Sequence, residues 1–105
     1  MKKALLCCSG GFSSTAVAQA LDMYSIKDGY KWSAMGIAAG LFSSDEFDGK
    51  SIILISPQIR FRFEEIKKIC DEKNIKVMQI PPELYLPSTA ATLWTKVKEV
   101  LEIVK

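Results

Sequence analysis

The sequence predicts an α/β protein in which the strands of a parallel sheet alternate with helices. Residues 4–8 (Ala-Leu-Leu-Cys-Cys) form a short, continuous apolar run that ends before a glycine pair, a pattern typical of a buried parallel strand. Residues 51–56 form another such run, which stops at Pro57. Helical periodicity follows each of these two runs. Strands and helices that alternate in this way form right-handed crossovers, so we expect one parallel sheet with helices on both faces.

The first unit is predicted to be a strand, a tight loop and a helix. From Ser13 onward, the apolar residues share one helical face, and they are Val17, Ala20, Leu21 and Tyr24. Gly29 stands where a helix C-cap is expected, because glycine readily takes the left-handed conformation of that position.

The middle of the chain is predicted to hold an edge strand and a buried strand. Residues 30–37 alternate aromatic and other side chains, which predicts an edge strand. Residues 38–47 give a weaker pattern, which we interpret as one short helix, and Asp48-Gly49 predicts a turn. After the buried strand 51–56, Pro57 suits the first turn of a helix. That helix would carry one apolar stripe, consisting of Ile59, Phe63, Ile66 and Cys70.

The last part of the chain predicts a fourth strand and a final helix. Residues 76–80 form the strand, which Pro81-Pro82 ends, and Ser88 is the expected N-cap of the helix. The inner face of this helix consists of Leu93, Trp94, Val97, Val100, Leu101 and Val104. No internal repeat is visible. The length of 105 residues therefore predicts a single domain spanning 1–105.

Composition excludes several classes of function. The net charge is only +2, so the chain lacks the basic stripe of a nucleic-acid-binding protein. No apolar run approaches the roughly 20 residues of a membrane span. The run before Ser9 is also shorter than a secretion signal requires. Two of the three cysteines are adjacent, which is a poor disulfide framework and fits a reducing compartment. We therefore expect a cytoplasmic protein.

The chain contains no histidine. This absence excludes a Cys–His or Ser–His–Asp catalytic system, and a histidine-ligated zinc site, built within the chain. We expect the functional site described below to need neither a metal nor a cofactor.

The loop after the first strand is the strongest candidate for a functional site. Two glycines allow successive backbone N–H groups to point into one concavity, and the helix that follows adds the positive end of its dipole. The same donors would stabilise a phosphate and a Cys8 thiolate at the strand end. Cys8 is the candidate nucleophile, and the phosphate-binding residues are Ser9, Gly10, Gly11, Phe12, Ser13, Ser14 and Thr15.

This loop resembles the phosphorylation loop of the lactose/cellobiose-type enzyme IIB family of the sugar phosphotransferase system, which commonly reads Cys-Ser-x-Gly-Met-Ser-Thr. Residues 55–61 (Ile-Ser-Pro-Gln-Ile-Arg-Phe) are similar to the family's Pro-Gln segment after the third strand. The sequence departs from the family at Phe12, at Ser14 and over residues 32–40. The resemblance covers nearly the whole chain. It implies a sheet of order 2-1-3-4 in a flavodoxin-like or low-molecular-weight phosphatase-like three-layer sandwich.

The resemblance also implies a function. A IIB component accepts a phosphoryl group from a phosphohistidine of enzyme IIA and passes it to a sugar in the membrane subunit IIC. Cys8 would then carry phosphate during transport of a cellobiose-, lactose- or chitobiose-type sugar. The chain would be a protein-phosphohistidine–sugar phosphotransferase, with IIA and IIC as partners and with no membrane span or nucleic-acid partner of its own.

Two alternatives remain open at this point. A low-molecular-weight protein tyrosine phosphatase or arsenate-reductase-like enzyme would use the same loop, but the phosphatase has an arginine as the sixth residue after the cysteine. Ser14 occupies that position here. Arginine clamps phosphate bidentately, so its absence favours relay over hydrolysis. The other alternative is a non-enzymatic anion-binding module, in which Cys8 would be unreactive.

Residues outside the loop are weaker candidates. The carboxyl ends of parallel strands meet at one edge, so the Pro57-Gln58 segment is expected near Cys8. Pro57, Gln58, Arg60 and Tyr85 are therefore possible rim or partner contacts. For Cys7 and Cys70 we expect packing roles, because Cys7 faces the other side of its strand and Cys70 lies on an apolar helix stripe.

Overall fold

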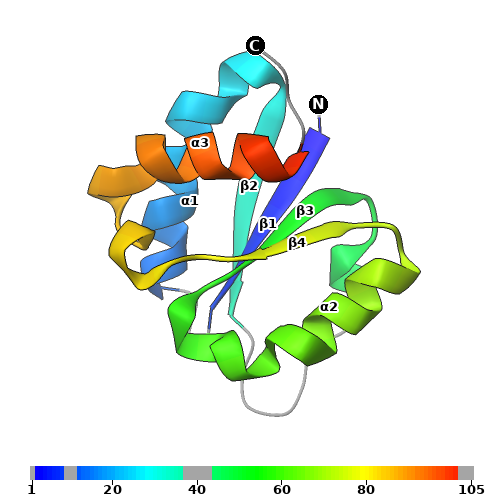
Figure 1. Ribbon diagram of the computed structural model, residues 1–105. Helices are drawn as coiled ribbons and strands as arrows, with labels where there is room; N and C mark the ends of the chain where they lie inside the picture. Colours follow the sequence, from blue (N-terminus) through cyan, green and yellow to red (C-terminus); the bar gives the residue numbers. More distant parts are fainter. Residues whose placement is uncertain (1, 9–11, 37–43, 102–105) are drawn as a thin grey trace.

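The computed structural model describes residues 2–8, 12–36 and 44–101 of the chain. In this part of the chain the strands are β1 (Lys2–Cys8), β2 (Tyr30–Gly36), β3 (Lys50–Ile55) and β4 (Lys76–Gln79). The α-helices are α1 (Phe12–Ser25), α2 (Phe63–Glu72) and α3 (Ala90–Leu101). Short 3₁₀ turns connect them, namely η1 (Ile26–Asp28), η2 (Ser44–Phe47), η3 (Pro57–Arg62), η4 (Pro82–Leu84) and η5 (Pro87–Thr89). Strands and helices alternate along the chain, as the sequence predicts (Figure 1).

The four strands form one sheet in the order β2-β1-β3-β4. This is the predicted order 2-1-3-4, which is therefore confirmed. Every pairing is parallel, as also predicted. β1 and β3 lie in the middle, which explains why their sequences are continuous apolar runs rather than alternating ones. β2 is at an edge, as its mixed polarity predicts.

Helices cover both faces of the sheet: α1 and α3 lie on one face and α2 lies on the other (Figure 1). The α1/α3 layer buries Ala4 and Leu6 of β1 with Ile52 and Leu54 of β3. The α2 layer buries the alternate residues of the same strands. They are Leu5, Cys7, Ile53 and Ile55. Successive side chains on a strand point to opposite faces, so a central parallel strand must be apolar at every position.

The edge strand β2 is held by Asp22 of α1. One carboxylate oxygen of Asp22 accepts a 2.7 Å hydrogen bond from the backbone N–H of Trp32, and the other accepts a 3.2 Å bond from Lys31 Nζ. The indole N–H of Trp32 donates a 3.0 Å bond to the buried hydroxyl of Ser25. A strand at the edge of a sheet has unpaired backbone groups, and α1 supplies an acceptor for one of them.

Gly29 makes the connection from α1 to β2 possible. Its φ of +85° lies in the left-handed region that glycine tolerates best, and it caps η1 through a 3.0 Å bond from its N–H to the carbonyl of Ile26. Its own carbonyl accepts a 2.8 Å bond from the N–H of Lys2, at the start of β1. Gly29 is a C-cap in the left-handed conformation, as predicted, but it caps η1, because α1 itself ends at Ser25.

The helix predicted to begin at Pro57 is interrupted. Pro57 opens η3, and α2 begins only at Phe63. Ile59 breaks the regular geometry, with φ −119° and ψ 26°. Its side chain is nevertheless buried with Ile66 and Cys70 in the α2 layer, so the apolar stripe packs as predicted although the helix is not continuous.

Two other local predictions are wrong. Ser88 lies inside η5, where Leu86 is the N-cap and Thr89 Oγ1 donates back to the Leu86 carbonyl, so Ser88 does not cap α3. Tyr24 is 42% exposed, because the buried face of α1 continues to Ser25 instead. Of the short helix predicted over 38–47, the described residues show η2; residues 37–43 and Val104 lie outside the described part.

Candidate functional site

Cys8 is the last residue of β1, at the carboxyl edge of the sheet. It is 2% exposed and pairs in register with Gly36 of β2. Helix α1 begins at Phe12, one residue before the predicted start, and its first turn has no acidic residue. The amino end of a helix favours an anion, and an acidic side chain there would oppose one. The strand end and the helix start that the predicted phosphate site requires are therefore both present.

Part of the predicted loop lies outside the described residues. Ser9, Gly10 and Gly11 are not described, and of residues 12–14 only the helical backbone is described. Thr15 is exposed on α1. The roles of these residues in binding phosphate therefore remain predictions.

The other two cysteines lie in the α2 layer. Cys7 and Cys70 belong to the same buried cluster, and neither is exposed. Burial, followed by the negative charge of the neighbouring cysteines, raises the pKa of the Cys7 thiol to about 12. Burial also raises the pKa of Cys70 to about 11, with Asp71 adding to the effect. A thiol with a raised pKa is a poor nucleophile, because the thiolate is the reactive form. Packing roles for Cys7 and Cys70 are therefore supported.

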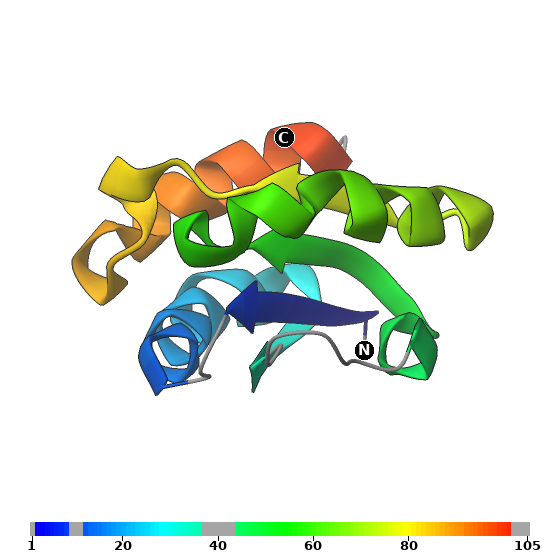
Figure 2. The ribbon, with the colours of Figure 1, turned by 90° about the horizontal axis from the view of Figure 1, so that it is seen from below.

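The carboxyl ends of β3 and β4 lie at the edge of the sheet that carries Cys8. The backbone N–H of Ser56 donates a 2.9 Å hydrogen bond to the carbonyl of Cys7, and the N–H of Ile80 donates a 2.8 Å bond to the carbonyl of Ile55. These bonds bring Pro57 to the same edge as Cys8, as the parallel topology predicts. In Figure 2 the arrow of β1 points toward the side on which the turns after β3 and β4 lie.

The weaker candidates at this edge differ in exposure. Gln58 and Arg60 are exposed on η3, whereas Pro57 is half-buried. Arg62 is paired with Glu65, through Nε–Oε1 at 3.1 Å and Nη2–Oε2 at 3.2 Å. Tyr85 is 9% exposed and packs in the α1/α3 layer, so little of its surface is available to a ligand or partner.

Ser56 is a residue that the sequence analysis did not single out. Its side chain is fully buried at the end of β3, and in the described part of the chain its hydroxyl has no hydrogen-bond partner. An unsatisfied buried polar group costs about 1–3 kcal/mol. The signal in the sequence was a polar residue between a buried strand and Pro57, which we interpreted only as the end of the strand.

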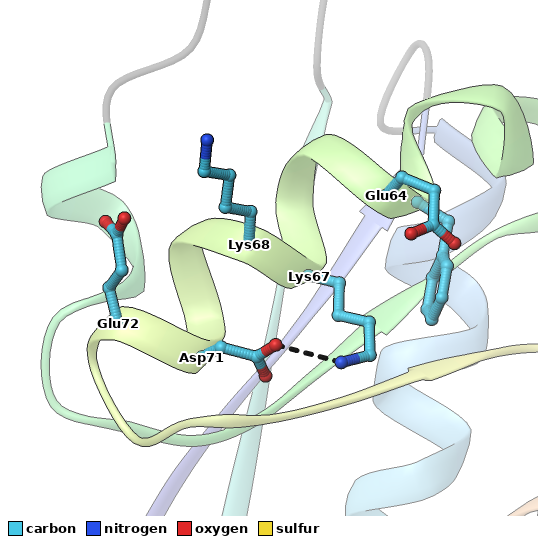
Figure 3. Close-up of a pocket in the computed structure, with 6 residues that line it drawn as sticks. Glu64, Lys67, Lys68, Asp71 and Glu72 are labelled. Atoms are coloured by element: carbon cyan, nitrogen blue, oxygen red, sulfur yellow. Dashed lines mark hydrogen bonds and ion pairs between the residues drawn. The ribbon is translucent and has the colours of Figure 1, made fainter.

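A hollow on the outer surface of α2 is a separate feature (Figure 3). Its lining comes from that helix alone, and it consists of Phe63, Glu64, Lys67, Lys68, Asp71 and Glu72. Lys67 and Asp71 form a 2.9 Å ion pair across it. Because both signs of charge alternate there and neither Cys8 nor Ser56 contributes, the hollow has no connection with the thiol.

Within residues 2–8, 12–36 and 44–101, no group of three or more histidine, cysteine or acidic residues could hold a metal ion. None of the helices described is long and apolar enough to cross a membrane.

Comparisons with known proteins reveal a likeness in fold. No protein-family model and no curated protein matches the sequence. Among solved structures, the chain is similar to the lactose-specific IIB component domain of the phosphoenolpyruvate:carbohydrate phosphotransferase system from Streptococcus pneumoniae. The TM-score is 0.69 at 22% identity, over 90% of this chain and 95% of that one. It is also similar to the cellobiose-specific phosphotransferase IIB component of Borrelia burgdorferi, with a TM-score of 0.65 at 21% identity, over 96% of this chain and 92% of that one. The chain therefore shares the fold of these IIB components.

Proposed function

We propose that this chain is the phosphoryl-relay (IIB) component of a sugar phosphotransferase system, with Cys8 as the phosphorylated residue. One observation carries the proposal: in a fold shared with lactose- and cellobiose-specific IIB components, a cysteine ends the first strand immediately before the turn into α1. The sequence of that turn resembles the IIB phosphorylation loop. The proposed setting is cytoplasmic, with enzyme IIA as donor and the membrane subunit IIC as the place of sugar transfer.

The proposed reaction has two steps. The Cys8 thiolate attacks the phosphorus of a phosphohistidine; the S–P bond forms, the P–N bond breaks, and the imidazole keeps the electron pair and takes up a proton. A sugar hydroxyl then attacks the same phosphorus; the P–O bond forms, the S–P bond breaks, and the hydroxyl proton is released. Backbone N–H groups at the start of α1 would hold the phosphoryl oxygens, which are anionic throughout.

Relay chemistry requires that water reach the phosphocysteine slowly. Cys8 is 2% exposed, so bulk water has little access to the sulfur. The absence of an arginine six residues after Cys8 also removes the group that accelerates hydrolysis in the phosphatases with this loop.

Intact-mass spectrometry tests the proposal. The protein is incubated with phosphoenolpyruvate, the general phosphotransferase proteins and a IIA component of the lactose/cellobiose type. We expect one added phosphate, which peptide mapping assigns to Cys8. If a IIA component that phosphorylates its own IIB partner leaves this chain unmodified, the relay function is wrong, and turnover of a small aryl phosphate would then distinguish a phosphatase from an anion-binding module.

A further inference from the structure

The hydroxyl of Ser56 is unusual among the buried polar side chains. The two buried polar residues of the described chain are Ser25 and Ser56. The hydroxyl of Ser25 accepts a hydrogen bond from the indole of Trp32 at 3.0 Å. The hydroxyl of Ser56 has no partner among the described residues. Hydroxyls that lie in a protein interior are normally hydrogen-bonded, so this one calls for an explanation.

Ser56 lies next to Cys8 across the sheet. Cys7 pairs in register with Ile55, and the N–H of Ser56 donates to the Cys7 carbonyl at 2.9 Å. Ser56 keeps an extended backbone, with φ −70° and ψ 157°. The next register position therefore sets Cys8 beside Ser56, on neighbouring strands that are about 4.8 Å apart.

The two side chains also share one face of the sheet. Ile53 and Ile55 face the α2 layer, so strand alternation directs Ser56 to the opposite face. Cys7 faces the α2 layer as well, which directs Cys8 to the face that Ser56 occupies. The unpartnered hydroxyl and the thiol thus lie side by side at the carboxyl edge.

We infer that Ser56 Oγ donates a hydrogen bond to a phosphoryl oxygen on Cys8, which makes Ser56 a phosphoryl-binding residue. This inference rests on the proposed function. A serine hydroxyl has one proton to donate, and a phosphoryl oxygen is a charged acceptor that strengthens the bond. Among the described residues the hydroxyl has no partner in the unmodified protein, and phosphorylation of Cys8 would supply one. The free energy of this hydrogen bond therefore favours the phosphorylated form. The oxygens of the phosphoryl dianion carry more negative charge than those of the loose, metaphosphate-like transition state, so the bond is weaker in that transition state and the loss of phosphate to water is slowed.

Two variants test the inference. Ser56→Ala removes the donor, and Ser51→Ala removes a half-buried hydroxyl from the same strand at its other end. Each protein is phosphorylated with phosphoramidate, which has the P–N bond of phosphohistidine, and the phosphocysteine is followed by intact mass. The loss of a hydrogen bond to a charged group changes an equilibrium or rate constant by a factor of about ten or more. We expect the half-life of the phosphocysteine to fall about tenfold in Ser56→Ala and to be unchanged in Ser51→Ala.

Two further readings separate phosphoryl binding from a purely structural role. The melting temperature of unmodified Ser56→Ala should equal or exceed that of the wild type, because the variant buries no unpaired hydroxyl. The phosphorus-31 resonance of its phosphocysteine should titrate at higher pH, because the dianion has lost a donor.

Three outcomes overturn the inference. Equal half-lives in wild type and Ser56→Ala would show that the hydroxyl does not bind the phosphoryl group. A lower melting temperature of the unmodified variant, with an unchanged phosphorus titration, would show that Ser56 is structural. A wild-type protein that takes up no phosphate, from either phosphoramidate or a IIA component, would refute the proposed function and the hydrogen bond with it.

Discussion

Cys7 and Cys8 are adjacent in the sequence but lie on opposite faces of β1. Cys7 packs in the α2 layer with Cys70, whereas strand alternation turns Cys8 toward the α1/α3 face. Cys8 is also the last residue of its strand, while Cys7 is enclosed on all sides, with 0% exposure. The two neighbouring thiols therefore have different chemical environments, and substitution can distinguish them.

Substitution of Cys8 should abolish phosphoryl acceptance, whereas substitution of Cys7 or Cys70 should leave it nearly intact. We expect no added phosphate on Cys8→Ser in the intact-mass assay, because the serine hydroxyl is a much weaker nucleophile than a thiolate. Cys7→Ser and Cys70→Ser should still be modified.

The core variants need a control for stability. A serine in place of Cys7 or Cys70 buries a hydroxyl in an apolar cluster, which costs about 1–3 kcal/mol. Cys7→Ala and Cys70→Ala avoid that cost, and circular dichroism checks that each variant is folded. Equal loss of phosphorylation in all three folded cysteine variants would contradict the assignment of Cys8.

Stability should fall at alkaline pH because of the buried thiols. The folded pKa values, about 12 for Cys7 and about 11 for Cys70, lie above the ordinary value of 9.0. Between pH 9 and about 11–12 the unfolded chain has released these protons while the folded chain retains them. The contribution of the thiols to stability is thus complete below pH 9 and is lost as the pH rises through this window.

Urea unfolding at a series of pH values measures this effect. The comparison uses wild type and Cys7→Ala, because the raised pKa values of Lys67 and Lys73 act in the same direction in both proteins. We expect the free energy of unfolding to decline less steeply above pH 9 in Cys7→Ala. Parallel curves for the two proteins would mean that Cys7 ionises normally in the folded state.

Much of the fold follows from pattern. Continuous apolar runs in β1 and β3 indicate central parallel strands, and their order with helices between them determines the topology. The errors lie where the chain forms 3₁₀ turns in place of regular helix starts. Ile59 has a side chain suited to a helical stripe, but Pro57 starts a 3₁₀ turn whose backbone bends before α2. Serine is favoured at helix N-caps, but Ser88 lies inside η5, which continues directly into α3.

The candidate site was predictable in part. Cys8 was identifiable because it ends a buried strand and is followed by a glycine pair and several hydroxyl residues. Ser56 was not, because its importance comes from the register of β1 with β3 and from a missing hydrogen bond. Both are properties of three-dimensional structure, and no local pattern encodes them.

Asp22 should contribute more to stability through a backbone hydrogen bond than through its ion pair. Asp22→Ala leaves the N–H of Trp32 without its 2.7 Å acceptor, which should cost about 1–3 kcal/mol. Lys31→Ala removes only the ion pair, whose lysine side chain is 62% exposed, so its cost should be below about 1 kcal/mol. Thermal or urea unfolding of the two variants measures the difference.

Hydrogen exchange in the edge strand β2 provides a second measurement that distinguishes Asp22→Ala from Lys31→Ala. Hydrogen exchange at the Trp32 amide should accelerate in Asp22→Ala and remain slow in Lys31→Ala, because only Asp22 accepts from that amide. Asp22→Asn retains an oxygen acceptor and should recover most of the stability. Equal destabilisation by Asp22→Ala and Lys31→Ala would indicate that the ion pair is the dominant interaction.

Trp94 should be the most sensitive position of α3, because it combines packing with a hydrogen bond. Its ring lies 5.5 Å from that of Tyr30 and 6.4 Å from that of Trp32, in tilted and perpendicular arrangements. Its indole N–H donates a 3.1 Å bond to Asp28. Trp94→Phe retains an aromatic ring but loses the N–H, and we expect a loss of about 1–3 kcal/mol. Trp94→Ala also loses the ring contacts and should cost about 3–5 kcal/mol.

Fluorescence makes this prediction easy to check, because Trp32 and Trp94 are the two tryptophans of the chain. In Trp94→Phe, Trp32 is the remaining tryptophan, so its fluorescence alone reports unfolding. Trp32 is 4% exposed, and its ring packs against the ring at position 94. Urea titration followed by fluorescence and by circular dichroism should give coincident transitions at a lower midpoint. If Trp94→Phe were as stable as the wild type, the hydrogen bond to Asp28 would contribute no net stability, and Trp94 would stabilise the fold through its ring contacts with β2 alone.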